Sequence, residues 1–70
     1  MEKVIVENLP ITLAQFLKWA GLVINGGEAK TIIREGLVEL NGETCLVAGQ
    51  KLKIGDVIAI EDQKFIVASE

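Results

Sequence analysis

Hydrophobic residues recur at helical spacing in the segment that follows Pro10. Thr12 precedes the pattern and Gln15 stands three residues later, the arrangement of a capping box, in which each side chain bonds to the backbone of the other residue. The apolar positions are three and four residues apart, so they share one face of a helix. They are Leu13, Phe16, Leu17 and Ala20. Gly21 is a typical helix stop, and the pattern predicts a short helix between Thr12 and Gly21.

A second helix is predicted a few residues later from the same kind of signal. Asn25 is a good N-cap, and Glu28 is its expected capping-box partner. The pair Gly26-Gly27 weakens the first turn, because each glycine costs about 1 kcal/mol relative to alanine inside a helix. The stripe that would face the core comprises Ala29, Ile32 and Ile33. Gly36 ends the pattern, and a helix this short must pack on other elements to be stable.

The second half of the chain has the character of short strands. Leu37 to Leu40 and Glu43 to Leu46 flank Asn41-Gly42, which supplies the two positive φ angles of a type I′ hairpin turn. Ala48 to Gln50 is predicted to be a loop, and Gly55-Asp56 marks a turn. Further strands are predicted at Lys3 to Val6, Leu52 to Ile54, Val57 to Ile60 and Lys64 to Val67. Two helices grouped together and followed by strands indicate an α+β fold.

The length of 70 residues predicts one domain, spanning residues 1–70. At this size folding buries only roughly 60% of the surface of the chain, so the core is small. The single cysteine, Cys45, excludes an intrachain disulfide and favours a reducing setting. There is no signal-peptide pattern, and no apolar run approaches the ~20 residues of a membrane span. We therefore expect a cytoplasmic protein that does not enter a membrane.

Few residues of the chain could carry catalysis. There is no His and no Tyr, and Cys45 has no basic neighbour that would activate its thiol. Potential metal ligands do not occur at a recognisable spacing. Gly26-Gly27 before a helix could bind a phosphate, but the Lys-Ser/Thr pair of a phosphate loop is absent. We therefore expect no enzyme activity, no metal or other cofactor, and no small-molecule substrate.

Seven basic residues are outnumbered by ten acidic ones, which gives a net charge of −3. Nucleic-acid binding would therefore depend on a local basic patch. Lys30 and Arg34 are four residues apart, so they share a helix face, about 100–140° from the centre of the buried stripe. Lys18 lies on the polar side of the first helix. Simple solvation, or neutralisation of Arg34 by nearby glutamates, is the alternative for these cations.

Two further features bear on binding. Lys51 and Lys53 alternate with Leu52, so in an extended segment the two lysines share one face. Trp19 stands at the border of the apolar stripe of the first helix. It could pack against the second helix or the sheet, or its ring could stack on an RNA base.

Three segments of the chain form an ordered set of motifs. They are Glu28-Ala29-Lys30, the ten residues from Ile33 to Gly42, and the eight from Lys51 to Ile58, which contain Gly55-Asp56. At these spacings the stretch from Ile11 to Ile60 resembles the S-four domain, an RNA-binding family with the αL motif, and is most similar to its small stand-alone bacterial members. The resemblance implies two short helices packed on a small antiparallel sheet of four to five strands, and a non-catalytic, ribosome-associated role.

The resemblance also implies where RNA would bind. In that family the two helices and an adjoining loop form the RNA-facing surface. By position, Lys30 and Arg34 match basic sites of the second helix, and Lys51 matches a basic site before the Gly-Asp turn. Lys18 and Lys53 complete the expected RNA-binding set. The implied partner is structured RNA, with ribosomal and transfer RNA as the candidates.

Two features depart from the family pattern. Gly26-Gly27 stands where many members have arginine, and Leu46 to Gln50 is uncharged where similar members carry an arginine-rich run. An alternative function is therefore a protein–protein interaction module with little RNA affinity, which would use this loop and Trp19 as apolar contacts. A ubiquitin-like sulfur carrier is a third alternative, but that chemistry needs a C-terminal Gly-Gly and the chain ends in Ala68-Ser69-Glu70.

Overall fold

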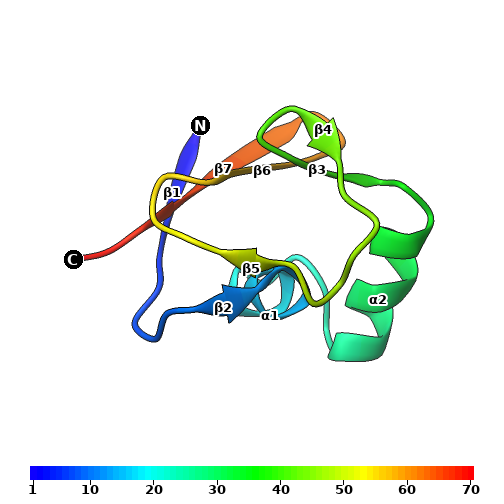
Figure 1. The fold of residues 1–70 in the computed structure, drawn as a ribbon, viewed down its shortest axis with the longest axis horizontal. Coiled ribbons are helices and arrows are strands. Elements are labelled where there is room, and N and C mark those ends of the chain that lie inside the picture. Colours follow the sequence, from blue (N-terminus) through cyan, green and yellow to red (C-terminus); the bar gives the residue numbers. More distant parts are fainter.

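Two helices and seven strands form the fold in the computed structural model, which describes residues 1–70 (Figure 1). A five-stranded sheet has the strand order β1-β7-β6-β3-β4, and β2 and β5 form a separate two-stranded sheet on the side of the helices. The elements in chain order are β1 (Glu2–Ile5), β2 (Ile11–Thr12), α1 (Leu13–Trp19), α2 (Gly26–Arg34), β3 (Val38–Leu40), β4 (Glu43–Thr44), β5 (Lys51–Leu52), β6 (Val57–Ile60) and β7 (Gln63–Ala68). The predicted α+β class, with two short helices and a main sheet of five strands, is confirmed.

The pairing of the first strand differs from the expected antiparallel sheet. The pairs β4–β3, β3–β6 and β6–β7 are antiparallel. β1, in contrast, runs parallel to β7, with Glu2 opposite Phe65 and Ile5 opposite Ala68. The two terminal strands therefore lie side by side at one edge of the sheet (Figure 1).

The hairpin between β3 and β4 confirms the turn predicted at Asn41-Gly42. Leu40 pairs with Glu43, and the two turn residues have φ angles of 52° and 88°. These angles match the type I′ turn, whose twist suits two antiparallel strands. β4 ends at Thr44, so it is shorter than the predicted strand, and the chain then leaves the sheet.

The capping box of α1 is formed as predicted. The Gln15 backbone N–H donates to Thr12 Oγ1 at 3.2 Å, and the Thr12 backbone N–H donates to Gln15 Oε1 at 2.9 Å. The helix ends at its C-cap, Ala20, and Gly21 follows with a φ of 77°. This left-handed conformation is one that glycine adopts readily, which explains why the helix stops there.

The start of α2 differs in one bond from the prediction. Asn25 caps the helix, because its Oδ1 accepts the backbone N–H of Glu28 at 2.8 Å. The Glu28 carboxylate, however, accepts the N–H of Ile24 at 3.3 Å rather than that of Asn25. The prediction of a reciprocal capping box was therefore wrong by one residue. The extended backbone of Asn25, with φ −155° and ψ 172°, leaves the Ile24 N–H as the donor within reach.

The core lies between the helices and the inner face of the five-stranded sheet. The largest fully buried side chains are Leu13, Phe16 and Leu17 of α1, Ile33 of α2, and Val38, Ile58 and Val67 of the sheet. Ala29 is also fully buried, whereas Ala20 and Ile32, which were predicted to share the buried stripes, are only half-buried. Each helix thus buries one face in the core, and its opposite face is exposed and accessible to other contacts.

Candidate nucleic-acid interface

Helix α2 carries opposite charges on its two exposed sides. Successive residues of a helix are rotated by about 100°, so Lys30 and Arg34 lie to one side of the buried stripe. The same geometry puts Glu28 and Glu35 on the other side. All four side chains are exposed to solvent. The helix therefore separates a positive surface from a negative one, although the chain as a whole is anionic.

The loop before β5 is held against the start of α1 by backbone hydrogen bonds. The Leu13 N–H donates to the Gln50 carbonyl oxygen at 2.8 Å, and the Ala14 N–H donates to the Ala48 carbonyl oxygen at 3.1 Å. These are N–H groups that the first turn of a helix leaves without an internal partner. Their use by the loop fixes Ala48 to Gln50 beside the helix.

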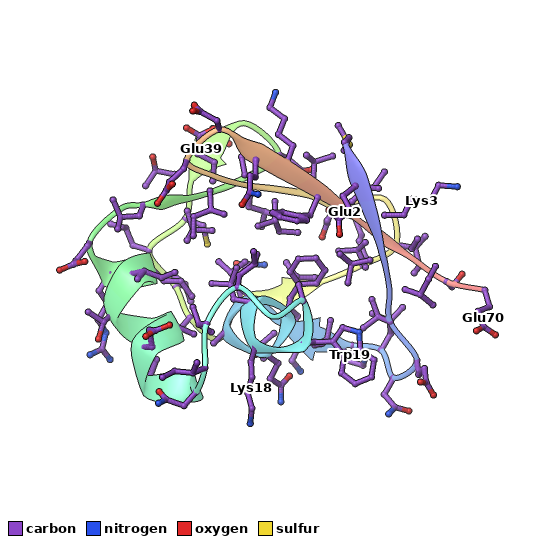
Figure 2. All side chains as sticks on the ribbon, turned by 180° about the vertical axis from the view of Figure 1, so that it is seen from behind. Glu2, Lys3, Lys18, Trp19, Glu39 and Glu70 are labelled. Atoms are coloured by element: carbon purple, nitrogen blue, oxygen red, sulfur yellow. The ribbon has the colours of Figure 1, made fainter.

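A cleft of about 290 Å³ is formed where this loop, α1 and the start of α2 meet. We refer to it as the basic cleft, because two lysines contribute to it and none of its lining residues is acidic. Lys18 comes from α1 and Lys30 from α2. The other lining residues are Thr12, Ala14, Gln15, Gly26, Ala48 and Gly49. In Figure 2 Lys18 points away from the five-stranded sheet, toward solvent.

A second cleft of about 450 Å³ lies on the other side of α2 and has the opposite charge. Glu28, Glu39 and Glu61 line it, together with apolar residues that include Leu37 and Ile32. No lysine or arginine lines this cleft. The contrast with the basic cleft shows that charge is segregated on this molecule, which net charge alone does not reveal.

The five cations of the expected RNA-binding set occupy different places relative to the basic cleft. Lys18 and Lys30 line it. Lys51 pairs in β5 with Thr12, a lining residue, so it borders the cleft. Arg34 lies in the last turn of α2, and Lys53 follows β5, and neither lines the cleft. The alternation predicted at 51–53 is seen in the burial, because both lysines are exposed and the residue between them is buried.

The side chains of the basic residues form no hydrogen-bonded ion pair with an acidic side chain of the protein. No hydrogen bond of the structure joins a side-chain nitrogen of a lysine or of the arginine to a carboxylate. In particular, neither Glu35 nor Glu39 bonds to Arg34, the neutralisation considered from the sequence. The positive charges of the cleft and of the adjoining side of α2 are therefore available to an external anion.

Sequence reasoning missed part of this site. Gln15 was identified as a capping residue, and Ala48 and Gly49 as a loop, but all three also form walls of the basic cleft. For Gln15 the signal was its position one turn before Lys18 and Trp19 on the same helix. For the loop there was no side-chain signal, because backbone groups hold it in place.

Trp19 is not a core residue. The residue is 53% exposed at the end of α1. Its indole Nε1–H donates to the carbonyl oxygen of Ile5 at 2.8 Å, which joins α1 to the end of β1. Figure 2 shows the ring beside the segment that follows β1. The polar edge of the ring is therefore held in place while much of the side chain remains accessible.

Other chemistry-bearing groups of the chain are isolated. Cys45 is half-buried, and its Sγ lies 3.7 Å from the Val47 carbonyl oxygen. No three or more His, Cys, Asp or Glu side chains gather where they could hold a metal ion. Neither helix has the length and apolar character needed to cross a membrane.

Comparisons with known proteins concern both the family and the fold of the chain. The S4 domain, which is the family that the sequence resembles, matches residues 4–68. A probable ribosome maturation protein, RlbA of Bacillus subtilis (strain 168), is 43% identical over 56 residues, which cover 80% of this chain and 79% of that protein. The crystal structure of the 30S ribosomal protein S4e from Thermoplasma acidophilum is similar to this chain, with a TM-score of 0.59 and 24% sequence identity. At this identity the similarity concerns the fold alone. That match covers 83% of this chain and 31% of the S4e chain. The family match and the bacterial relative together show that the chain belongs to the S4 domain family.

Proposed function

We propose that this protein is a non-catalytic RNA-binding module that contacts structured RNA through the basic cleft and the Lys30–Arg34 side of α2. The observation that carries the proposal is the composition of the cleft, where Lys18 and Lys30 meet without any acidic residue in a chain of net charge −3. Positive charge gathered against this overall balance suits a polyanion. Lys51 borders the same surface and Lys53 follows it along the chain.

The target that fits best is ribosomal RNA. The Bacillus subtilis relative is named a probable ribosome maturation protein. The resemblance of the sequence to the S4 domain implies that RNA binds at the two helices and an adjoining loop, and these elements form the basic cleft. Association with ribosomal RNA would place the protein in the cytoplasm. Recognition would depend on RNA shape or on an unpaired base, because the major groove of an RNA duplex is too narrow for side chains to read.

The first expected result concerns salt. If three to five cations contact phosphates, log K should fall linearly with log[salt] with a slope of about −2 to −4, because bound counterions are released from the RNA. Titration of a fluorescein-labelled RNA hairpin at several salt concentrations, read by anisotropy, measures the slope. A slope near zero would show that the cations of the protein do not contact the phosphates of the RNA.

The second expected result assigns the surface. Replacing both Lys30 and Arg34 by Ala should lower the RNA crosslinked to the protein in cells about tenfold, because two phosphate contacts are lost. The thermal unfolding midpoint should hardly change, since both side chains are exposed.

The matched control replaces Lys3 and Lys64 by Ala, two exposed lysines on the five-stranded sheet. This variant has the same net charge as the first but leaves the helices intact. Crosslinked RNA should stay near the wild-type level. Equal RNA recovery from both variants would mean that the assigned surface is wrong, and sequencing the crosslinked RNA identifies the target.

A third expected result is a gain of affinity. Gly26 lines the basic cleft, and a Cβ atom there would meet no other atom within 4 Å. Replacing Gly26 by Arg should therefore strengthen hairpin binding several-fold and make the salt slope steeper by about 0.7–0.9, the change expected for one added phosphate contact. Gly26→Gln, similar in length but uncharged, is the control. Equal affinity of the two variants would place RNA away from this cleft.

Protein–protein interaction is the second candidate function, and one observation favours it. Leu46 and Val47 are 57% and 58% exposed in the loop that leads to the basic cleft. Adjacent exposed apolar side chains are typical of contact surfaces for other proteins. A pull-down with the intact chain distinguishes the two functions, because a partner that persists after nuclease and high salt binds protein, whereas one lost with nuclease was held by RNA.

A further inference from the structure

The largest cleft of the molecule lies beside Trp19 and is not part of the basic cleft. Its volume is about 520 Å³, within the range of sites that hold small organic groups. We call it the Trp19 cleft. On one side it is lined by Gln15, Lys18 and Trp19 of α1. On the other side it is lined by Val6, Glu7, Asn8 and Pro10 of the segment after β1, and by Ile11 of β2.

We infer that the Trp19 cleft binds one unpaired RNA base, stacked on the indole of Trp19, while a neighbouring phosphate lies at Lys18. This inference rests on the proposed RNA-binding function and deepens it by naming the part of the RNA that enters. The argument has three steps, which concern the ring, the polar groups of the cleft, and the connection to the basic cleft.

The ring is suited to stacking because it is both exposed and fixed. The bond from Nε1 to the Ile5 carbonyl oxygen, 2.8 Å long, holds one edge of the indole on the backbone, while the residue as a whole is 53% exposed. A ring that is already oriented loses little conformational freedom when a base stacks on it. Aromatic platforms of this kind bind bases of any sequence, since every base has a π face.

The polar groups of the cleft suit a base better than a phosphate. Asn8 makes no side-chain hydrogen bond in the structure, and the Gln15 carboxamide uses only its oxygen, in the capping box. The free amide groups can both donate and accept, as the edge of a base requires. Glu7 also lines the cleft, and its carboxylate would repel a phosphate but can accept a hydrogen bond from a base amino group.

The cleft is continuous with the proposed phosphate-binding surface. Lys18 and Gln15 line both the Trp19 cleft and the basic cleft. If the phosphates of an RNA strand contact Lys30 and then Lys18, the next one or two nucleotides of that strand would therefore reach the Trp19 cleft. A base must leave its stack to enter, so single-stranded loops and bulges are the segments that fit.

The test uses the tryptophan itself as the probe, because the chain contains one Trp and no Tyr. The wild-type protein is titrated with three RNAs: a hairpin with a loop of unpaired adenosines, the same hairpin with abasic loop positions, and a blunt duplex. Fluorescence at tryptophan excitation is recorded, and binding is followed in parallel by anisotropy of labelled copies. The adenosine loop should quench the tryptophan strongly, while the abasic loop and the duplex should bind without quenching and more weakly.

Variants at the ring give a second measurement. Trp19→Ala should weaken binding of the adenosine-loop hairpin about tenfold, in keeping with the value of one stacked base, and leave the abasic hairpin unaffected. The salt slope should not change, because no phosphate contact is removed. The abasic comparison uses unmodified protein, so it stands even if Trp19→Ala lowers stability through the loss of the bond to Ile5.

The outcomes separate the two proposals. Binding of all three RNAs that depends on Lys30 and Arg34 but leaves Trp19 fluorescence unchanged would overturn the base site and keep the RNA-binding function. Binding of none of them would overturn both. A protein partner whose nuclease-resistant capture is lost in Trp19→Ala, with RNA binding intact, would show that the cleft holds a protein side chain instead.

Discussion

Replacing Asp56 by Ala should lower the free energy of unfolding by about 2–3 kcal/mol, the largest stability effect that we expect from a polar residue in this chain. Asp56 is the one buried charged residue, at 6% exposure. Its Oδ2 accepts the backbone N–H of Lys53 at 2.9 Å, and its Oδ1 accepts Nδ2 of Asn41 at 3.1 Å. The loss would leave both donors without their partner, which costs more than the net value of the bonds themselves.

The effect should extend to the hairpin, because Asn41 links two turns. Its Oδ1 accepts the backbone N–H of Val57 at 2.9 Å, so one side chain connects the β3–β4 turn to the start of β6. Chemical denaturation measures the free energy, and Asp62→Ala is the control, since Asp62 is exposed in the β6–β7 turn. The control should change stability by less than about 0.5 kcal/mol. Equal effects of the two variants would show that the buried network contributes nothing specific.

Reversing the charge of the basic cleft should nearly abolish RNA binding. In the variant Lys18→Glu/Lys30→Glu, two attractive contacts with phosphate become repulsive, and both carboxylates would stand in the same cleft. At low salt, where screening is weak, the affinity for the RNA hairpin should fall by about a hundredfold or more. Because both lysines are exposed, the protein should remain folded.

The control for this reversal is Lys3→Glu/Lys64→Glu, which changes net charge by the same amount on the sheet. Binding should weaken only a few-fold, through long-range repulsion. Anisotropy titrations at matched ionic strength measure both variants. If they lose affinity equally, net charge rather than the basic cleft governs binding, and the proposed surface is wrong.

The parts of the fold that neighbouring residues determine could be predicted from the sequence. Thr12 and Gln15 cap each other within one turn, and Asn41-Gly42 sets its own turn conformation, so both signals are local. The pairing of β2 with β5 was not foreseen, because Ile11 and Leu52 are far apart in sequence and two-residue strands have no periodicity. The parallel pairing of β1 with β7 likewise depends on tertiary packing.

The same division applies to the candidate site. Lys30 and Arg34 could be assigned to one face from helix geometry alone. The meeting of Lys18 with Lys30 could not, because it depends on how α1 packs on α2 and on a loop held by backbone hydrogen bonds. The sequence does not determine whether Trp19 packs in the core or is available for stacking, because a residue at the border of an apolar stripe can face either the core or solvent. Its orientation depends on the hydrogen bond from the indole N–H to the Ile5 carbonyl oxygen, which is a tertiary contact.

The opposite charges on the two sides of α2 create a local electric dipole across this helix. Near a polyanion such a molecule experiences a torque that turns its lysine-bearing side forward before contact. In the opposite orientation the polyanion would be repelled by Glu28, Glu39 and Glu61, which line the cleft on the other side of α2. The net charge of −3 would then shorten the time that the protein stays bound to unrelated RNA, and would favour the orientation in which the basic cleft faces the RNA.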